Sequence, residues 1–450
     1  MRDIFFILYL AALFGIAFRR PFLFVLCYVY IDIVSPQRLT YLLLNSIQIS
    51  AIAVALAVGA WLAVDDKRDM RVAPRQVLML ILLGYCGYTT VHADFPVEAL
   101  DKWEWVWKAL AFAIFLPLTL RTRLRIEALL LFMVLSAATL IVTGGLKTVL
   151  SGGGYGQLTL FVANNSGLYE GSTISTVAIA IIPTVLWFAR HGTVFPPDWR
   201  VKAFCYALVF ACLLIPIGTS TRTGLLCIGL LGVLMLRDVK RRLLYLALAG
   251  TLGLGAVPFL PSAFSERMAT IGTYQADASA STRIAVWQWT MEYVRSNPMG
   301  GGFEAYRQNR IRYDKVKVEG EGNNVAVERQ LEIDAGRAYH SAYFEMLGEQ
   351  GYFGLALWLL INLGGIVRME VLRRRHAGDA AAPWAAPLAS ALQNGHVVFL
   401  LGASFVAIAF QPFIFMLIGA QIGLDTYLAR KRREAAWRPM RRQRRAAMPV

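Results

Sequence analysis

The sequence predicts an all-α polytopic membrane protein with about 12 transmembrane helices. Of its 450 residues, 57% are hydrophobic and only 16% are charged, and the apolar residues form long continuous runs. A soluble globular domain carries about 25% charged residues, whereas a transmembrane helix needs roughly 20 mostly apolar ones. The runs are rich in Leu, Ala and Ile and lack the alternating polarity of β-barrel strands. This composition argues against soluble, fibrous and disordered classes.

Thirteen apolar runs are candidate spans, ten before a long polar stretch and three after it. They lie at 4–18, 21–35, 43–64, 77–92, 104–120, 125–144, 172–189, 203–219, 224–236, 243–261, 343–367, 394–410 and 412–429. Thirteen crossings would place residue 1 outside, whereas Arg2 favours the inside. We therefore expect either 4–18 or 21–35 not to cross, with both chain ends in the cytoplasm. We also expect no cleavable signal peptide, because the first run leads into Arg19–Arg20–Pro21 without a small-residue cleavage site.

The basic residues predict the orientation. The formal net charge is +16, and Lys and Arg gather in alternate connectors and in the C-terminal tail. Short basic loops stay in the cytoplasm, so the other connectors face outward. We predict an N-terminal transmembrane bundle (1–261), a large periplasmic loop domain (262–342), C-terminal transmembrane helices (343–429) and a basic cytoplasmic tail (430–450).

The loop domain 262–342 holds ten cations and ten anions, so it is neutral by count. Ser281 or Thr282 is expected to cap an amphipathic helix that ends at Asn297–Pro298, and the following glycines turn the chain. Gly320 and Gly322 lie among charges in 313–335, and this stretch is expected to be a mobile loop.

The cysteines are expected to be core residues. All five lie in or at the ends of apolar runs and none lies in the outside loop, so no disulfide framework or CxxC metal site is predicted. They are Cys27, Cys86, Cys205, Cys212 and Cys227.

Arg222 lies in Thr219–Gly224 (TSTRTG), between two apolar runs on the outward side. An arginine near a membrane is often only a snorkelling or capping residue. The alternative is an anion contact, because a guanidinium is permanently charged and binds two phosphate oxygens at once. Backbone donors at the start of the following helix would strengthen such a site. Arg283, placed in the first turn of the loop helix, would form the second half of a two-arginine clamp.

His340 lies where the outside loop re-enters the membrane. A lone histidine is more often structural than catalytic, but a neutral imidazole can accept a proton near neutral pH, as a general base must. Glu345 and Glu349 are one helical turn apart after it, and one of them could orient the ring or act as an alternative base. The adjacent Tyr339 is a further supporting candidate.

Several reaction classes lack their motifs. The chain has no Walker motif, no GxGxxG after a strand, no HExxH and no GxSxG. Nucleotide hydrolysis, zinc proteolysis and α/β-hydrolase chemistry are therefore unsupported. The residues alone indicate a membrane protein with an outward-facing polar site for an anionic substrate.

With these segments the chain resembles the O-antigen ligase family (WaaL), within a superfamily that includes O-antigen polymerases and bacterial protein O-oligosaccharyltransferases. The resemblance rests on the layout of the spans and on four segments: 219–224, Ser281–Thr282–Arg283 followed by Trp287, Asn297–Gly302 (NPMGGG), and His340–Gly351 running to Gly354. The N-terminal third is similar to ligases found with exosortase systems, which keeps a protein acceptor open.

The resemblance implies a GT-C-like glycosyltransferase of the bacterial inner membrane with its active site on the periplasmic side. Such enzymes transfer a glycan from undecaprenyl diphosphate to a hydroxyl of lipid A-core, with inversion and without metal, nucleotide or other cofactor. Arg222 and Arg283 would bind the diphosphate, and His340 would activate or position the acceptor hydroxyl. Membrane lipids are expected partners and nucleic acid is not.

Three alternatives stay open. The first is another member of the superfamily, a polymerase or a ligase onto protein. The second is a transporter of lipid-linked glycans, although no convincing internal repeat of the kind that transporters carry is visible. The third is a non-catalytic envelope scaffold.

Overall fold

The computed structural model describes residues 2–40, 44, 47–150, 168–242, 244, 247, 250–251, 278–319 and 326–436. The N-terminal helices are α1 (Arg2–Arg19), α2 (Leu23–Val34), α3 (Pro36–Leu39), α4 (Ile49–Val64), α5 (Pro74–Val91), α6 (Pro96–Thr119) and α7 (Arg123–Leu150). They are followed by α8 (Gly171–His191), α9 (Trp199–Gly218), α10 (Arg222–Met235) and the 3-10 turn η1 (Leu236–Asp238). The remaining elements are α13 (Ala278–Ser296), η4 (Ala305–Gln308), β1 (Arg310–Glu319), β2 (Ala326–Ala335), α14 (Ala342–Arg375), α15 (Ala385–Ala403) and α16 (Pro412–Ala436).

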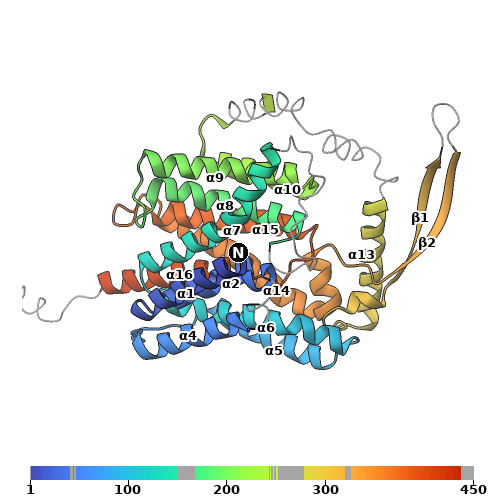
Figure 1. The fold of residues 1–450 in the computed structure, drawn as a ribbon, viewed down its shortest axis with the longest axis horizontal. Coiled ribbons are helices and arrows are strands. Elements are labelled where there is room, and N and C mark those ends of the chain that lie inside the picture. The colour runs from blue at the N-terminus through green and yellow to red at the C-terminus, as the bar shows by residue number, and fades with distance from the viewer. Residues whose placement is uncertain are drawn as a thin grey trace, which may run out of the picture.

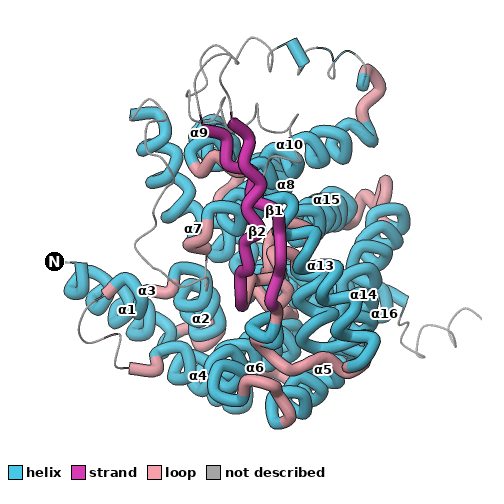
Figure 2. The backbone as a smooth tube through the Cα atoms, turned by 90° about the vertical axis from the view of Figure 1, so that its right-hand side faces the viewer, coloured by secondary structure: helices cyan, strands magenta, loops and turns pink. Residues whose placement is uncertain are grey.

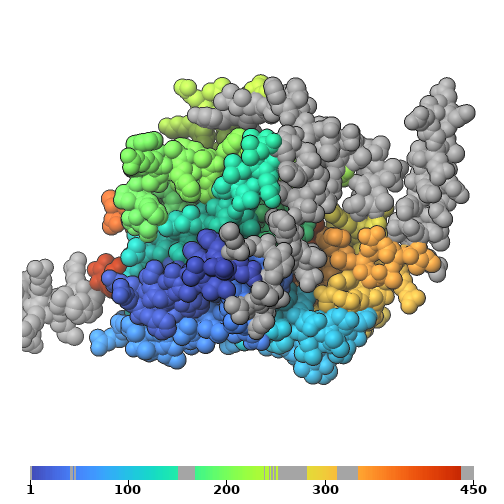
Figure 3. Space-filling view, viewed as in Figure 1, coloured from blue at the N-terminus to red at the C-terminus, as the bar shows by residue number. Residues whose placement is uncertain are grey.

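Long apolar helices form a bundle whose axes follow the long direction of the molecule (Figure 1). Helix α8 packs against α9, α10 and α15, while α16 packs against α6 and α7. The N-terminal helices α1 and α4 lie on one outer face of the bundle, shown in blue in Figure 3. All five cysteines are buried and free, as predicted. The all-α polytopic fold class is confirmed.

Five described helices have the length and apolar composition to cross a membrane: α7, α8, α9, α14 and α16. Helices α2, α4 and α10 are apolar but shorter. At 12 residues, α2 is only about 18 Å long, less than the roughly 30 Å of a hydrocarbon core. Helices α4 and α10 are also shorter than this thickness, so the expectation that one of the first two runs does not cross stays a prediction. The candidate span 243–261 falls mostly outside the described residues, and the count of about 12 spans stays a prediction.

The expectation of a mobile loop at 313–335 was wrong. Strands β1 and β2 pair as an antiparallel hairpin that projects from one end of the bundle beside α13 (Figures 1 and 2). Their register places Lys317 opposite Glu328 and Val318 opposite Val327. Opposite charges and β-branched pairs across a ladder favour pairing. Gly320 and Gly322 lie outside the described residues, in the segment 320–325 that follows β1 in sequence.

A tight glycine turn at 297–302 is hydrogen-bonded to α14. The amides of Gly301 and Gly302 donate to the carbonyls of Gly348 and Glu349, both at 3.0 Å. Helix α14 breaks at Gly351, whose φ is 63°, and a Cβ there would lie 2.1 Å from the carbonyl oxygen of Pro298. Only glycine fits this approach. This contact explains why 297–302 and 348–351 both carry glycines.

The basic connectors meet at the opposite end of the bundle. Arg125 forms a two-pronged ion pair with Asp65 at 2.6 and 2.7 Å, and Arg123 donates to the carbonyl of His191 at 2.8 Å. Arg121 donates to the carbonyl of Arg68, also at 2.8 Å. These contacts join connectors far apart in sequence. We call this the basic end, and the end that carries α13 and the hairpin the His340 end.

Candidate functional site

His340 lies in the short connection between β2 and α14, and its side chain reaches solvent. Its φ of 47° lies in the left-handed region, which few non-glycine residues adopt. Two contacts hold the chain on either side of it. The indole nitrogen of Trp287 donates to the carbonyl of Tyr339 at 2.8 Å, and the Trp287 ring stacks on Phe344 with centroids 4.9 Å apart. Helices α13 and α14 therefore fix the backbone that carries the histidine.

Charged residues from three segments act on the His340 ring. Partial burial lowers the pKa of His340, Arg283 of α13 and Arg337 lower it further, and Glu170 opposes them. The structure thus brings together His340 and Arg283, two of the predicted site residues. A lowered pKa keeps the imidazole neutral at neutral pH, as a proton acceptor requires.

Arg222 begins α10, directly after a loop of hydroxyl side chains. The Ser175 hydroxyl lies 2.8 Å from that of Thr219 and 2.9 Å from that of Thr221, so α8 supports this loop. Ser220 has a φ of 49°, a second left-handed non-glycine residue. A Cβ at Gly171 would lie 3.7 Å from the Thr221 methyl group, which places the loop next to the residue after Glu170.

Three helices begin at these residues. Glu170 precedes α8 and accepts from the Thr173 amide at 2.6 Å, Arg222 is the first residue of α10, and His340 lies two residues before α14. The first amides of a helix have no partner within it and favour negative charge. With Arg222, Arg283 and Arg337 nearby, the site has the character of an anion-binding site. We call Glu170, Arg222, Arg283 and His340 the His340 site.

Arg283 is not in a first turn, and the prediction that Ser281 or Thr282 caps its helix was wrong. Helix α13 extends back at least to Ala278, so all three residues lie within it. The dipole argument for an anion at Arg283 therefore fails. The support that stands is the electrostatic effect of Arg283 on the pKa of His340.

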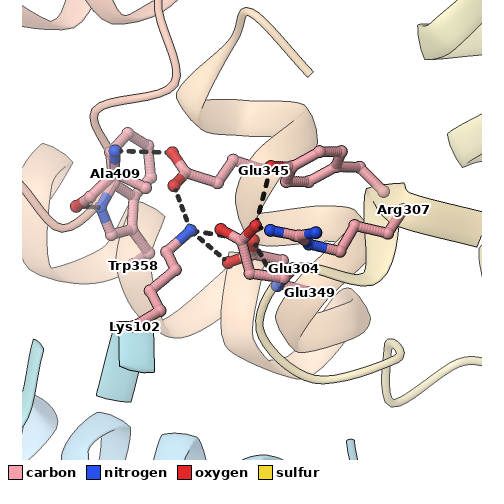
Figure 4. Close-up of polar contacts among 8 residues, drawn as sticks. Lys102, Glu304, Arg307, Glu345, Glu349, Trp358 and Ala409 are labelled. Carbon is pink, nitrogen blue, oxygen red and sulfur yellow. Dashed lines mark hydrogen bonds and ion pairs between the residues drawn. The ribbon is translucent and has the colours of Figure 1, made fainter. Parts of the chain in front are cut away.

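Glu345 and Glu349 belong to a separate buried cluster around Lys102 of α6 (Figure 4). The Lys102 ammonium lies 2.7 Å from Glu345 and 2.8 Å from Glu349, and the two carboxylate side chains are 5% and 0% exposed. The second oxygen of Glu345 accepts from the Ala409 amide at 2.9 Å, and Glu349 accepts from the Glu304 amide at 3.0 Å. These bonds assign both carboxylates to the Lys102 cluster rather than to the His340 ring.

Tyr339 is 1% exposed, and its ring packs edge-on against Tyr306 with centroids 5.6 Å apart. Its hydroxyl lies over Gly348, where a Cβ would come within 2.3 Å of it. Burial, reinforced by Glu349, raises the pKa of Tyr339 well above its usual range. The Tyr339 phenol therefore lies in the protein interior beside the Lys102 cluster, whereas the adjacent His340 is exposed. The phenol stays protonated at neutral pH.

Two functional candidates were missed from the sequence. Glu170 carries no strong sequence signal, because Glu is not among the preferred N-cap residues and its bond to the Thr173 amide is seen only in the structure. Lys102 could have been found as a cation at the edge of an apolar run, which needs a partner when buried. Within the described part of the chain, no three His, Cys, Asp or Glu residues are grouped as metal ligands.

Comparison with known proteins divides the chain in two. Residues 207–359 match the family model described as O-antigen ligase, and residues 1–193 match a family of unknown function, DUF5935. The first match contains Arg222, Arg283 and His340, whereas Glu170 and Lys102 lie in the second.

A curated relative, the exopolysaccharide production protein ExoQ of Rhizobium meliloti (strain 1021), is 26% identical over 137 residues. The aligned part covers 30% of this chain and 29% of that protein. The fold is that of a multi-pass membrane protein, and its segment 207–359 is similar to the O-antigen ligase family.

Proposed function

We propose that the protein is an O-antigen ligase. It transfers a glycan from undecaprenyl diphosphate to a hydroxyl of lipid A-core at the periplasmic face of the inner membrane. The observation that carries the proposal is an exposed His340 ring that Arg283 influences electrostatically, in an open, positively charged site where three helices begin. A neutral base beside fixed cations suits a reaction in which a hydroxyl loses a proton while a diphosphate leaves.

In the proposed reaction the acceptor oxygen attacks the anomeric carbon of the donor sugar. The new carbon–oxygen bond forms as the bond to the diphosphate breaks, so the configuration inverts. The diphosphate leaves with the bonding electrons, and the hydroxyl proton passes to the His340 ring. Arg222 and Arg283 stabilise the charge that develops on the leaving oxygens. The proposal assigns this role to the two guanidinium groups and requires no metal or cofactor.

A polymerase is the second candidate, and the match to ExoQ favours it, because that relative is named for exopolysaccharide production. A polymerase would use the same donor site but would take a lipid-linked glycan as acceptor. The two candidate functions therefore differ only in the acceptor molecule that binds opposite the donor diphosphate.

Purified protein offered competing acceptors tests the proposal. The reaction would contain a polyprenyl-diphosphate-linked glycan with lipid A-core, a second lipid-linked glycan and a pilin-like protein. The donor glycan would carry a label, and we expect the label to move to lipid A-core. Label moving only to the lipid-linked glycan would replace ligase with polymerase, and no transfer to any acceptor would contradict the enzyme assignment. Arg222→Ala and Arg283→Ala should each reduce donor use by about 10- to 100-fold, the effect of losing a charged hydrogen bond.

A further inference from the structure

A cavity of about 410 Å³ opens at the basic end, between the ends of α6 and α16. Its charged lining consists of one carboxylate, Asp69, and five arginines, Arg71, Arg121, Arg430, Arg432 and Arg433. The rest is mainly apolar and includes Pro117, Leu118 and Leu120. The cavity thus combines an excess of guanidinium groups with an apolar wall at the boundary between helix and connector.

Nearby carboxylates offset only part of this charge. Asp66 lies 3.8 Å from Arg121, and Glu434 lies 3.6 Å from Arg430, both at distances of weak ion pairs. Arg71, Arg432 and Arg433 are exposed. Like charges gathered this closely repel one another, so a bound anion would stabilise the arrangement.

Arg121 lines the cavity, and its guanidinium group is only partly paired. Its side chain is 17% exposed, and one terminal nitrogen donates to the Arg68 carbonyl at 2.8 Å. The other terminal nitrogen is buried and has no hydrogen-bond partner among the described residues. Buried donors without partners cost roughly 1–3 kcal/mol, more when charged. Arg430 donates to the carbonyl of Arg121, which fixes the two arginines against each other.

We propose that this cavity binds the phosphate group of an anionic lipid. Arg121 and Arg430 hold the phosphate against the wall of the cavity, the exposed arginines surround its mouth, and the apolar wall contacts the acyl chains. Basic pockets between membrane helices on the cytoplasmic side bind such headgroups, and the basic end is the one expected to face the cytoplasm. The site lies at the opposite end from the His340 site and does not depend on the proposed transfer reaction.

Lipid retention tests the site. The protein would be reconstituted in nanodiscs of equal phosphatidylglycerol and phosphatidylcholine, extracted, and examined by native mass spectrometry. The variants are Arg121→Gln/Arg430→Gln in the wall and Arg432→Gln/Arg433→Gln at the mouth, where folding is not at risk. Arg190→Gln is the control, because Arg190 is an exposed arginine of a basic connector outside the cavity. A second arm measures binding of inorganic phosphate to lipid-free protein in detergent.

We expect selective retention of phosphatidylglycerol, weakened about five-fold for each arginine removed and unchanged in Arg190→Gln. Equal retention of phosphatidylglycerol by all variants would overturn the proposal. So would equal retention of the two lipids by the unmodified protein, if inorganic phosphate does not bind either. Phosphate binding that depends on Arg121 but is not accompanied by lipid retention would support the phosphate site and assign it to a free anion.

Discussion

The two ends of the bundle both gather arginines but arrange them differently. At the His340 end, Arg283 and Arg337 come from separate segments and act on one titratable ring, and Arg222 begins α10. At the basic end, five arginines line one cavity and share its charge. A reaction needs particular atoms at particular positions, whereas binding a headgroup needs mainly summed charge. Single substitutions should therefore be severe at the first end and graded at the second.

Left-handed backbone conformations occur at both ends of the bundle. His340 and Ser220, both at the His340 end, hold left-handed conformations that cost about 1–3 kcal/mol each outside glycine. Such strain persists only where surrounding contacts fix the chain, here the bonds of Trp287 to Tyr339 and of Ser175 to Thr221. At the basic end Asp69 has a left-handed φ of 58°, whereas most of the arginines that line the cavity lie on a helix or at its end.

The largest effect is expected from His340→Ala. Loss of a general base lowers a rate by about 10²- to 10⁴-fold, so glycan transfer should fall by that amount while helix content and thermal stability are unchanged. His92→Ala is the matched control, since His92 is exposed and its ring nitrogen lies 2.9 Å from the Tyr88 carbonyl. Glycan transfer by His340→Ala at a near-native rate would show that His340 is not the general base. The proposed contrast between the two ends of the bundle would then fail as well.

Lys102→Met should produce the largest loss of stability. It leaves Glu345 and Glu349 buried without their cation, which typically costs about 3–5 kcal/mol. Lys108→Met on the same helix removes an ion pair to the 63%-exposed Glu104 at 3.3 Å, and should cost under about 1 kcal/mol. Tryptophan fluorescence during thermal unfolding in detergent measures both. Equal melting temperatures for the two variants would show that the Lys102 cluster does not stabilise the His340 end.

Much of the bundle could be predicted from the sequence because its signals are local. Apolar runs placed the described spans, and the run predicted from residue 224 lies within two residues of the observed start of α10 at Arg222. The end of α13 at Ser296, before Asn297–Pro298, also followed from local chemistry. Each of these features depends on residues within a few positions of one another.

The features that were missed depend on distant partners. Lys102 pairs with carboxylates 243 and 247 residues away, so neither side of the pair identifies the other in one sequence. The β1–β2 hairpin was missed because polar and apolar residues alternate imperfectly along both strands, and their pairing register depends on two segments that meet only in the fold. Glu170 gains its significance from His340, which follows it far along the chain.

The smallest expected effect is a shift in the pH profile, and its direction can be tested by two opposite substitutions. His340 must be neutral to accept a proton, so activity falls as the pH drops below its pKa, which is lowered from the usual value. Glu170 raises that pKa and Arg337 lowers it. Glu170→Gln should therefore move the acidic limb of kcat/KM to lower pH, and Arg337→Gln should move it to higher pH. Each shift should be about half a unit, because solvent screens both charges.

Neither substitution removes a proposed diphosphate contact, so the shift separates electrostatic tuning of the ring from loss of donor binding. Glu170→Gln keeps a side-chain oxygen for the Thr173 amide, which the structure places at 2.6 Å from the Glu170 carboxylate. At the basic end, Arg121→Gln should leave the profile unchanged, because no reacting proton is expected there. Shifts in the same direction for Glu170→Gln and Arg337→Gln would mean that the acidic limb reports a different group. Identical pH profiles for all three variants would mean that His340 does not set the acidic limb.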